Sequence, residues 1–157
     1  MNTDDLKKIT QEIVAEASLL SAKHTGESSL PVNYACIFTQ SQSEFDEMTR
    51  LALQLGTIAD DTPTGPVFSI QPLTTSAGSL DMLKVRRPDP KRPERGDADF
   101  TATDFTAFKN THLNKPGFNL IVRKEMEMVE LIDSSFNVLA YYSHPTLAEV
   151  IAMRRKD

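Results

Sequence analysis

Charged side chains stand at alternate positions in two short segments of the chain. Lys84 and Arg86 belong to one segment, and Asp97 and Asp99 belong to the next. In a β-strand, residues two apart share one face of the sheet, and here the positions between the charges are apolar. We therefore expect the apolar residues to pack against a covering helix and the charges to lie on the other face. Tyr34, in an earlier apolar strand, is expected on the same polar face, which we call the cup.

The cup has two interpretations that the sequence leaves open. In the first, Arg86 binds a carboxylate or phosphate with its two-pronged guanidinium group and Tyr34 orients that ligand. Asp97 or Asp99 then acts as a general base if partial burial raises its pKa. In the second, Lys84 and Arg86 only form ion pairs with the two aspartates, because buried charges need partners.

The same carboxylates could bind a metal ion. Asp97 and Asp99, with Glu130 as a third ligand, offer the oxygen atoms that Mg²⁺ or Mn²⁺ prefers. Acidic residues at this spacing are also common on solvated strands, which is the simpler explanation. A divalent cation is thus a possible cofactor.

The single cysteine, Cys36, lies in an apolar run that predicts a strand. With no second cysteine it cannot form an intrachain disulfide, and no histidine or asparagine partner is identifiable from the sequence. We expect a buried thiol rather than a nucleophile, because free cysteines are among the most buried residues.

The basic stretch, residues 84–95, has six cations and two acids and so a balance of +4 in a protein of net charge −5. Its arginines, including Arg95, could meet the phosphates of a nucleotide or the surface of an acidic partner. Alternatively, they could pair with Asp89, Glu94 and other acids in a solvated crossover. The pI near 5.2 and the lack of aromatic residues between the cations argue against nucleic acid.

The order of predicted elements explains how these residues could come together. An amphipathic helix at 3–24 precedes two runs with the order strand, helix, strand, strand, strand. The first run is predicted at 32–39, 44–55, 57–61, 66–71 and 80–86. The second run is predicted at 96–102, 104–113, 118–123, 127–132 and 136–142. A short helix and a charged tail follow.

Matching punctuation in the two runs favours an internal duplication. Ser43 and Thr103 are predicted to cap the two helices sixty residues apart, and Gly56 and Gly117 are predicted to close them sixty-one apart. Thr3 is the predicted cap of the first helix. We expect one α+β domain, 1–157, with tandem βαβββ units at 32–87 and 96–142, a Pro/Arg bridge at 88–95 and a C-terminal tail at 143–157.

Four sequence segments carry a resemblance to a known family: NYACIF, SEFDEMTRLALQLG, LDMLKVRRPDPKRPERG followed by DADF, and VLAYYSHPTLAEVI. With their order, the chain resembles the vicinal oxygen chelate (glyoxalase/dioxygenase-like) superfamily, and within it the YecM-type branch with an added N-terminal helix. The resemblance implies a curved sheet that forms a cup, often with a divalent metal ion that binds vicinal oxygens of a substrate.

This sequence departs from the ligand set that the resemblance implies. A histidine is expected in the first strand, where the chain has Tyr34, and another at the start of the second unit, where it has Asp97. The glutamate expected from the final strand is absent from 136–142.

Our working hypothesis is a cytoplasmic protein or enzyme that binds a polar or anionic small molecule in the cup. The cytoplasm is expected because no apolar run approaches the length of a membrane span and the N-terminus does not resemble a signal peptide. The alternative is a non-enzymatic interaction module that uses the basic stretch. A monomer could close its own cup, and a homodimer is the other arrangement known in this superfamily.

Overall fold

Two runs of strand, helix, strand, strand, strand follow one another, as the duplication predicts. The computed structural model describes residues 1–156. The first unit contains β1 (Val32–Phe38), α2 (Gln42–Leu55), β2 (Gly56–Thr62), β3 (Gly65–Thr75) and β4 (Gly78–Arg86). The second unit contains β5 (Gly96–Phe100), α3 (Phe105–His112), β6 (Phe118–Val122), β7 (Glu127–Leu131) and β8 (Val138–His144). Helix α1 (Thr3–Thr25) precedes them, and α4 (Leu147–Lys156) follows.

The two units join edge to edge in one mixed, curved sheet with the order β2-β3-β4-β1-β5-β8-β7-β6. Within each unit the first strand pairs in parallel with the last, β1 with β4 and β5 with β8. Between the units, β1 and β5 pair antiparallel. The halves are thus related by an approximate twofold axis at this central pair, and the α+β fold class predicted from the sequence is confirmed.

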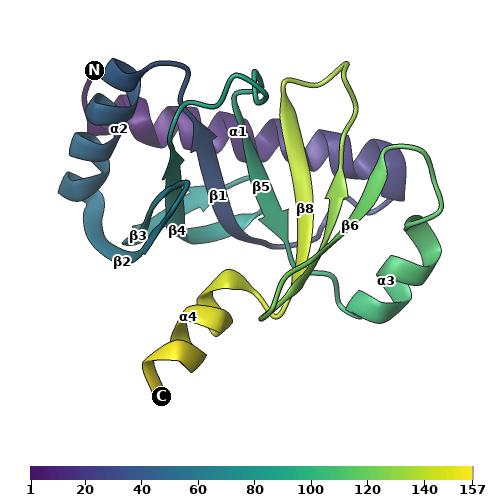
Figure 1. Cartoon of the computed structure of the whole chain (residues 1–157). Coiled ribbons are helices and arrows are strands. Elements are labelled where there is room, and N and C mark those ends of the chain that lie inside the picture. Colours follow the sequence, from purple (N-terminus) through teal and green to yellow (C-terminus); the bar gives the residue numbers. More distant parts are fainter. Residues whose placement is uncertain (157) are drawn as a thin grey trace.

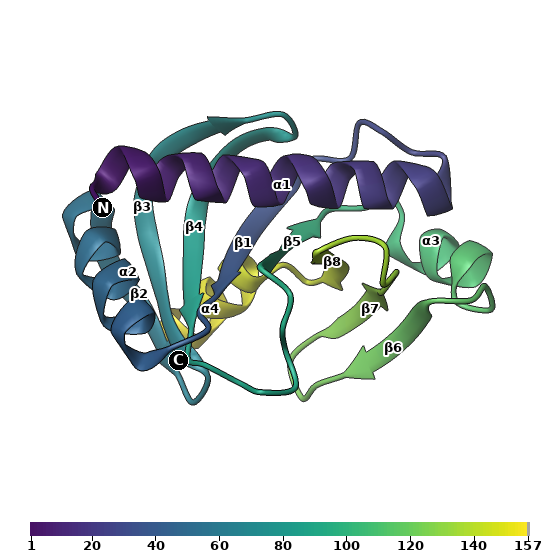
Figure 2. The same ribbon diagram turned by 90° about the horizontal axis from the view of Figure 1, so that it is seen from above.

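Helices cover the two faces of the sheet unequally. Helix α1 runs along nearly the whole width of one face, and α2 and α3 lie at its two ends (Figures 1 and 2). Helix α4 lies on the opposite face. That face carries the strand residues predicted for the cup. Helix α4 covers only part of it.

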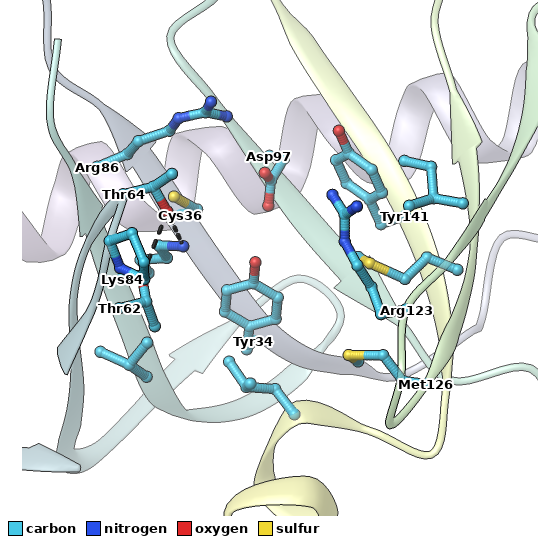
Figure 3. A pocket seen from close by; sticks show the side chains of 15 residues that line it. Tyr34, Cys36, Thr62, Thr64, Lys84, Arg86, Asp97, Arg123, Met126 and Tyr141 are labelled. Carbon is cyan, nitrogen blue, oxygen red and sulfur yellow. Dashed lines mark hydrogen bonds between the residues drawn. The ribbon is translucent and has the colours of Figure 1, made fainter. Parts of the chain in front are cut away.

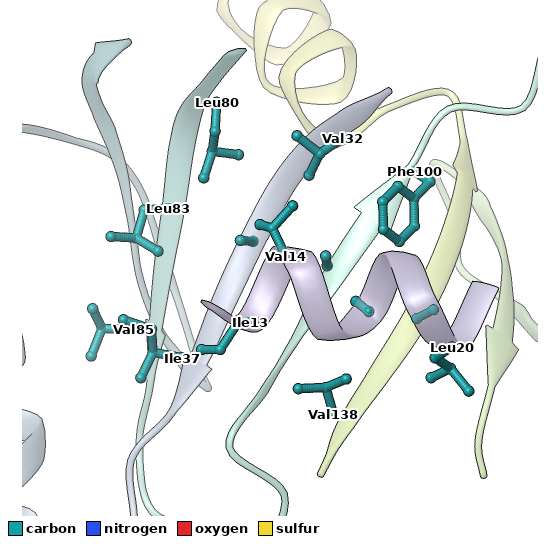
Figure 4. Packing of buried hydrophobic residues seen from close by; sticks show 14 of the residues in the cluster. Ile13, Val14, Leu20, Val32, Ile37, Leu80, Leu83, Val85, Phe100 and Val138 are labelled. Carbon is teal, nitrogen blue, oxygen red and sulfur yellow. The ribbon is translucent and has the colours of Figure 1, made fainter. Parts of the chain in front are cut away.

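The alternation along the strands determines which side chains reach α1. Ala98 and Phe100 of β5, with Leu83 and Val85 of β4, belong to the main hydrophobic core, as predicted. Figure 4 shows this core between α1 and the sheet. The intervening residues point away from α1, and Cys36 of β1 packs there in a smaller cluster.

The helix caps differ from our predictions. The N-caps are Asn2, Ser41 and Asp104, rather than Thr3, Ser43 and Thr103. Ser41 accepts a hydrogen bond from the backbone N–H of Glu44, so Ser43 already lies inside the first turn. Several hydroxyl and carboxyl side chains near each helix start could cap it, and the backbone path selects one.

The C-terminal region also differs. Strand β8 begins at Val138 rather than at residue 136, because the Asp133 side chain accepts hydrogen bonds from Ser135 and forms a turn there. The predicted short helix is α4, but it continues into the charged tail as far as Lys156, and Arg154 of that tail pairs with Glu125 and Asp60. Asp157 lies outside the described residues. Within residues 1–156, no helix combines the length and hydrophobicity that crossing a membrane requires.

Helix α1 offers a matched test of the core. Leu20 is 0% exposed in the main core, whereas its neighbour Leu19 is 65% exposed. We expect Leu20→Ala to lower the free energy of unfolding by about 3 kcal/mol, because it removes buried methyl groups and leaves a cavity. Leu19→Ala should change it by less than about 0.5 kcal/mol. Urea unfolding of both variants measures this, and equal effects would contradict the packing of α1.

Candidate functional site

A cavity of about 480 Å³ opens on the face of the sheet that α1 does not cover (Figure 3). Its polar lining comes from both units and consists of Tyr34, Cys36, Lys84, Arg86, Asp97, Arg123 and Tyr141. Its apolar lining consists of Val67, Ile121, Met126, Met128 and Leu147. Thr62, Pro63 and Thr64, in and beside the β2–β3 turn, complete it. The cavity occupies the predicted cup, and its volume suits a small metabolite.

The central strand pair builds the floor of the cavity. Cys36 of β1 lies directly opposite Asp97 of β5, and Tyr34 lies opposite Asp99. Of these four residues, Tyr34, Cys36 and Asp97 reach the cavity. Strand pairing between the two units therefore brings together side chains that are about sixty residues apart in the sequence.

Asp97 is the most unusual group of the floor. Its side chain is 5% exposed, and the Oδ1 atom has no hydrogen-bond partner within residues 1–156. Burial, with a smaller contribution from the charge of Asp99, raises the pKa of Asp97 to about 8, although Lys84 and Arg86 oppose the shift. Asp97 therefore carries a proton at neutral pH and can donate a hydrogen bond as well as accept one.

Asp99 has a different environment, although it belongs to the same strand. Ser143 donates hydrogen bonds to its carboxylate from both the backbone N–H and the hydroxyl, and Asn33 donates a third at 3.1 Å. Burial raises the pKa of Asp99 to about 6, and these hydrogen bonds limit the shift. Asp99 is absent from the cavity lining and joins β5 to its neighbours on both sides.

Tyr34 and Cys36 supply neutral groups to the floor. Burial raises the pKa of the Tyr34 hydroxyl and of the Cys36 thiol well above their usual values, and the Asp97 carboxylate acts in the same direction once it is ionised. Both groups are therefore protonated at neutral pH. Cys36 is buried as predicted, and its thiol also faces the cavity.

The cations of β4 do not neutralise the aspartates. Lys84 donates a hydrogen bond of 2.6 Å to the hydroxyl of Thr64, and Arg86 forms an ion pair of 3.2 Å with Asp89. Within residues 1–156, neither Asp97 nor Asp99 forms an ion pair. The interpretation in which Lys84 and Arg86 simply pair with these aspartates is therefore wrong, because strand β1 separates β4 from β5.

The second unit contributes residues that our sequence reasoning missed. Arg123 follows β6, and the hydroxyl of Tyr141 on β8 donates a hydrogen bond of 2.6 Å to Glu130. The repeat could have identified Arg123, because it follows Thr62 by sixty-one residues, the spacing between Gly56 and Gly117. Thr62 and Arg123 both line the cavity, Thr62 at the end of β2 and Arg123 just after β6.

The three carboxylates predicted as metal ligands are not grouped. Glu130 is held by Tyr141 and by Arg92, whose Nη2 lies 3.7 Å from its Oε2, whereas Asp99 is held by Ser143. Over residues 1–156, no three His, Cys, Asp or Glu side chains lie close enough together to hold a metal ion. The residues present thus do not fit the predicted ligand set, and we assign no step to a metal.

Most arginines of the basic stretch are paired with acids, as its crossover interpretation predicts. Arg92 lies 3.7 Å from Glu94, and Arg95 lies 2.9 Å from Glu12 of α1. Arg87 stacks over the ring of Phe45. Arg95, predicted as a ligand-binding residue, is absent from the cavity lining.

Helix α4 fastens the two units across the cavity. Leu147, in its first turn, lines the cavity. Near its end, Arg154 pairs with Asp60 of β2 at 2.9 Å and with Glu125 of the β6–β7 turn at 2.6 Å. Because these acids belong to different units, α4 links the edge strands on either side of the cup.

Comparison with known proteins supports the fold and gives no function. A solved structure described as structural genomics protein EC4020 superimposes with a TM-score of 0.72 at 12% sequence identity. The match covers 96% of this chain and 91% of that one, and at this identity it shows the fold alone. No protein-family model and no curated protein matches the chain.

The raised pKa of Asp97 has a consequence for stability. Between the ordinary value of 3.8 and about 8, folded Asp97 retains a proton that the unfolded chain has lost. The free energy of unfolding therefore falls as the pH rises through this window. Asp97→Asn removes this loss, so the variant should be more stable than the wild type, by a margin that grows from pH 4 to pH 8.

We expect a margin of about 3 kcal/mol at pH 8, roughly half of what about 1.4 kcal/mol per pKa unit implies, because the protein around a buried carboxylate relaxes when the group ionises. Urea unfolding at several pH values measures it. Asp81→Asn, which changes an exposed acid on β4, is the control and should show no such trend. A constant difference between Asp97→Asn and the wild type from pH 4 to pH 8 would contradict the assignment.

Proposed function

We propose that this protein binds a small anionic or polar molecule in the cup between its two units. The observation that carries the proposal is that one cavity of about 480 Å³ is lined both by a buried carboxyl group with an unpartnered oxygen, that of Asp97, and by the cations Lys84 and Arg86. A buried polar atom without a partner costs stability, and such costs are typical of binding sites.

The charges around the cavity favour a negatively charged ligand. The lining contains three cationic side chains and one carboxyl group, that of Asp97. Because burial keeps Asp97 protonated at neutral pH, the lining is strongly positive. Arg86 has guanidinium nitrogens besides the one that contacts Asp89, and these can bind a carboxylate or phosphate.

The floor favours a ligand with a carbonyl or hydroxyl group beside its anionic group. Protonated Asp97 and the Tyr34 hydroxyl are both donors on the floor, and Figure 3 shows them near the middle of the cavity. A group with a pKa near neutrality is also suited to transfer a proton. We propose that Asp97 is the acid or base if the protein is an enzyme, with Tyr34 as the orienting group.

We also infer that the chain belongs to the vicinal oxygen chelate superfamily, in its YecM-type branch. The support is the pair of βαβββ units, each with its first strand next to its last, and the leading helix α1. In this proposal the cup is retained, while Tyr34 and Asp97 occupy positions where histidine ligands are expected.

The competing function is an interaction module that uses the basic stretch. Arg92 and Arg95 of this stretch form ion pairs with Glu94 and Glu12, and Arg86 lines the cup, which leaves few of its charges available for a partner. Lys84 is also drawn into the cup, where it bonds to Thr64. These contacts favour the small-molecule proposal over the interaction module.

A ligand screen tests the proposal. We expect small carboxylates, keto acids or phosphates to raise the melting temperature, because a ligand that binds only the folded state stabilises it. For the best compound, Arg86→Gln should weaken binding by about 10- to 100-fold, the effect of losing a charged hydrogen bond. Isothermal titration calorimetry measures the affinities.

Arg50→Gln is the matched control, because Arg50 is exposed on α2 and its one ion-pair partner within residues 1–156 is Glu47. It should bind like the wild type. If no anion stabilises the protein, or if Arg86→Gln and Arg50→Gln bind the same compound equally well, the cup is not the binding site.

A further inference from the structure

The cations of the cavity lie on two opposite walls. Lys84 and Arg86 project from β4 of the first unit, whereas Arg123 projects from the end of β6 in the second unit. Four strands, β1, β5, β8 and β7, separate β4 from β6 in the sheet. Figure 3 shows Arg86 and Lys84 on one side and Arg123 on the other, with Asp97 and Tyr34 between them.

Each wall has one cation without an acidic partner within residues 1–156, Lys84 on one wall and Arg123 on the other, whereas Arg86 pairs with Asp89. Arg123 forms no ion pair within residues 1–156, since the neighbouring acid, Glu125, is paired with Arg154. Over the same residues, the Lys84 side chain is bonded only to a neutral hydroxyl, that of Thr64. Two positive charges on facing walls repel each other, and anionic groups bound between them would offset that repulsion.

The lining between the walls is partly apolar. Met126 lies on the same side of the cavity as Arg123 (Figure 3), and Met128 and Leu147 also belong to the lining. Unbranched methionine side chains adapt to a short carbon chain. The cavity thus offers charge at both ends, apolar contacts along its length and hydrogen-bond donors at its middle.

From this arrangement we propose that the ligand is a small dianion with two anionic groups at opposite ends of a short carbon chain. One end binds Lys84 and Arg86, the other binds Arg123, and a central oxygen accepts hydrogen bonds from Asp97 and Tyr34. The inference rests on the proposed function, because it assigns a ligand class to the same cup. It links the two units through the ligand.

Matched pairs of acids test the inference. Calorimetric titrations would compare glutarate with butyrate and 2-oxoglutarate with 2-oxobutyrate, and 3-phosphoglycerate with glycerate would show whether a phosphate can replace one carboxylate. We expect each acid with an anionic group at both ends to bind at least tenfold more tightly than its partner with one anionic group. Arg123→Gln should abolish that advantage, because it weakens the binding of acids with two anionic groups far more than that of acids with one, whereas Lys84→Gln should weaken both.

Arg123 is exposed, so Arg123→Gln should melt like the wild type without ligand, and Arg50→Gln should keep the full dianion advantage. Equal binding of monoanions and dianions, with no effect of Arg123→Gln, would overturn the two-ended ligand and leave the proposed function intact. If none of these acids binds at millimolar concentration, both the inference and the proposed function fail.

Discussion

The antiparallel pairing of β1 with β5 is the constraint on which the rest of the structure depends. It joins two similar units into one sheet and sets Cys36 of one directly opposite Asp97 of the other. The close approach also requires Gly96. A Cβ atom there would overlap the carbonyl oxygen of Cys36 and lie 2.9 Å from Cδ1 of Ile13 on α1. This strand pair thereby forms the floor of the cup on one face of the sheet and the surface against which α1 packs on the other.

This arrangement creates a conflict that a ligand can resolve. The core beneath the sheet is well filled, whereas the cup above it contains a buried carboxyl group with an unpartnered oxygen. Keeping Asp97 protonated limits the cost of burying it at neutral pH, and that cost grows in alkaline solution. A ligand with an acceptor oxygen would satisfy the group, and its negative charges would be balanced by Lys84, Arg86 and Arg123.

The periodicity of the sequence predicts the fold well, because it is a local property that the sheet must satisfy. Alternation placed Lys84, Arg86 and Asp97 on one face, and repeated turn residues identified the two units. Element ends were less predictable, as the caps at Asn2 and Ser41 show, because several neighbouring residues offer similar hydrogen bonds.

The partners of the site residues could not be predicted from local pattern. Whether Arg86 pairs with Asp89 or Asp97 depends on strand order and sheet curvature, and neither is encoded in a short segment. The same holds for Asp99, which bonds to Ser143 of a strand that follows much later in the chain. The internal repeat could have predicted the position of Arg123, because Arg123 corresponds to Thr62 at the turn after the second strand of each unit.

The central claim is that the cup keeps the carboxyl group of Asp97 protonated and leaves it free to hydrogen-bond a ligand. A direct measurement is a ¹³C NMR titration of the side-chain carboxyl carbons, with the Asp97 signal assigned by its loss in Asp97→Asn. We expect that signal to titrate with an apparent pKa near 8 in the free protein. An apparent pKa below about 4.5, in the ordinary range for aspartate, would mean that Asp97 is solvated or paired and would contradict this account.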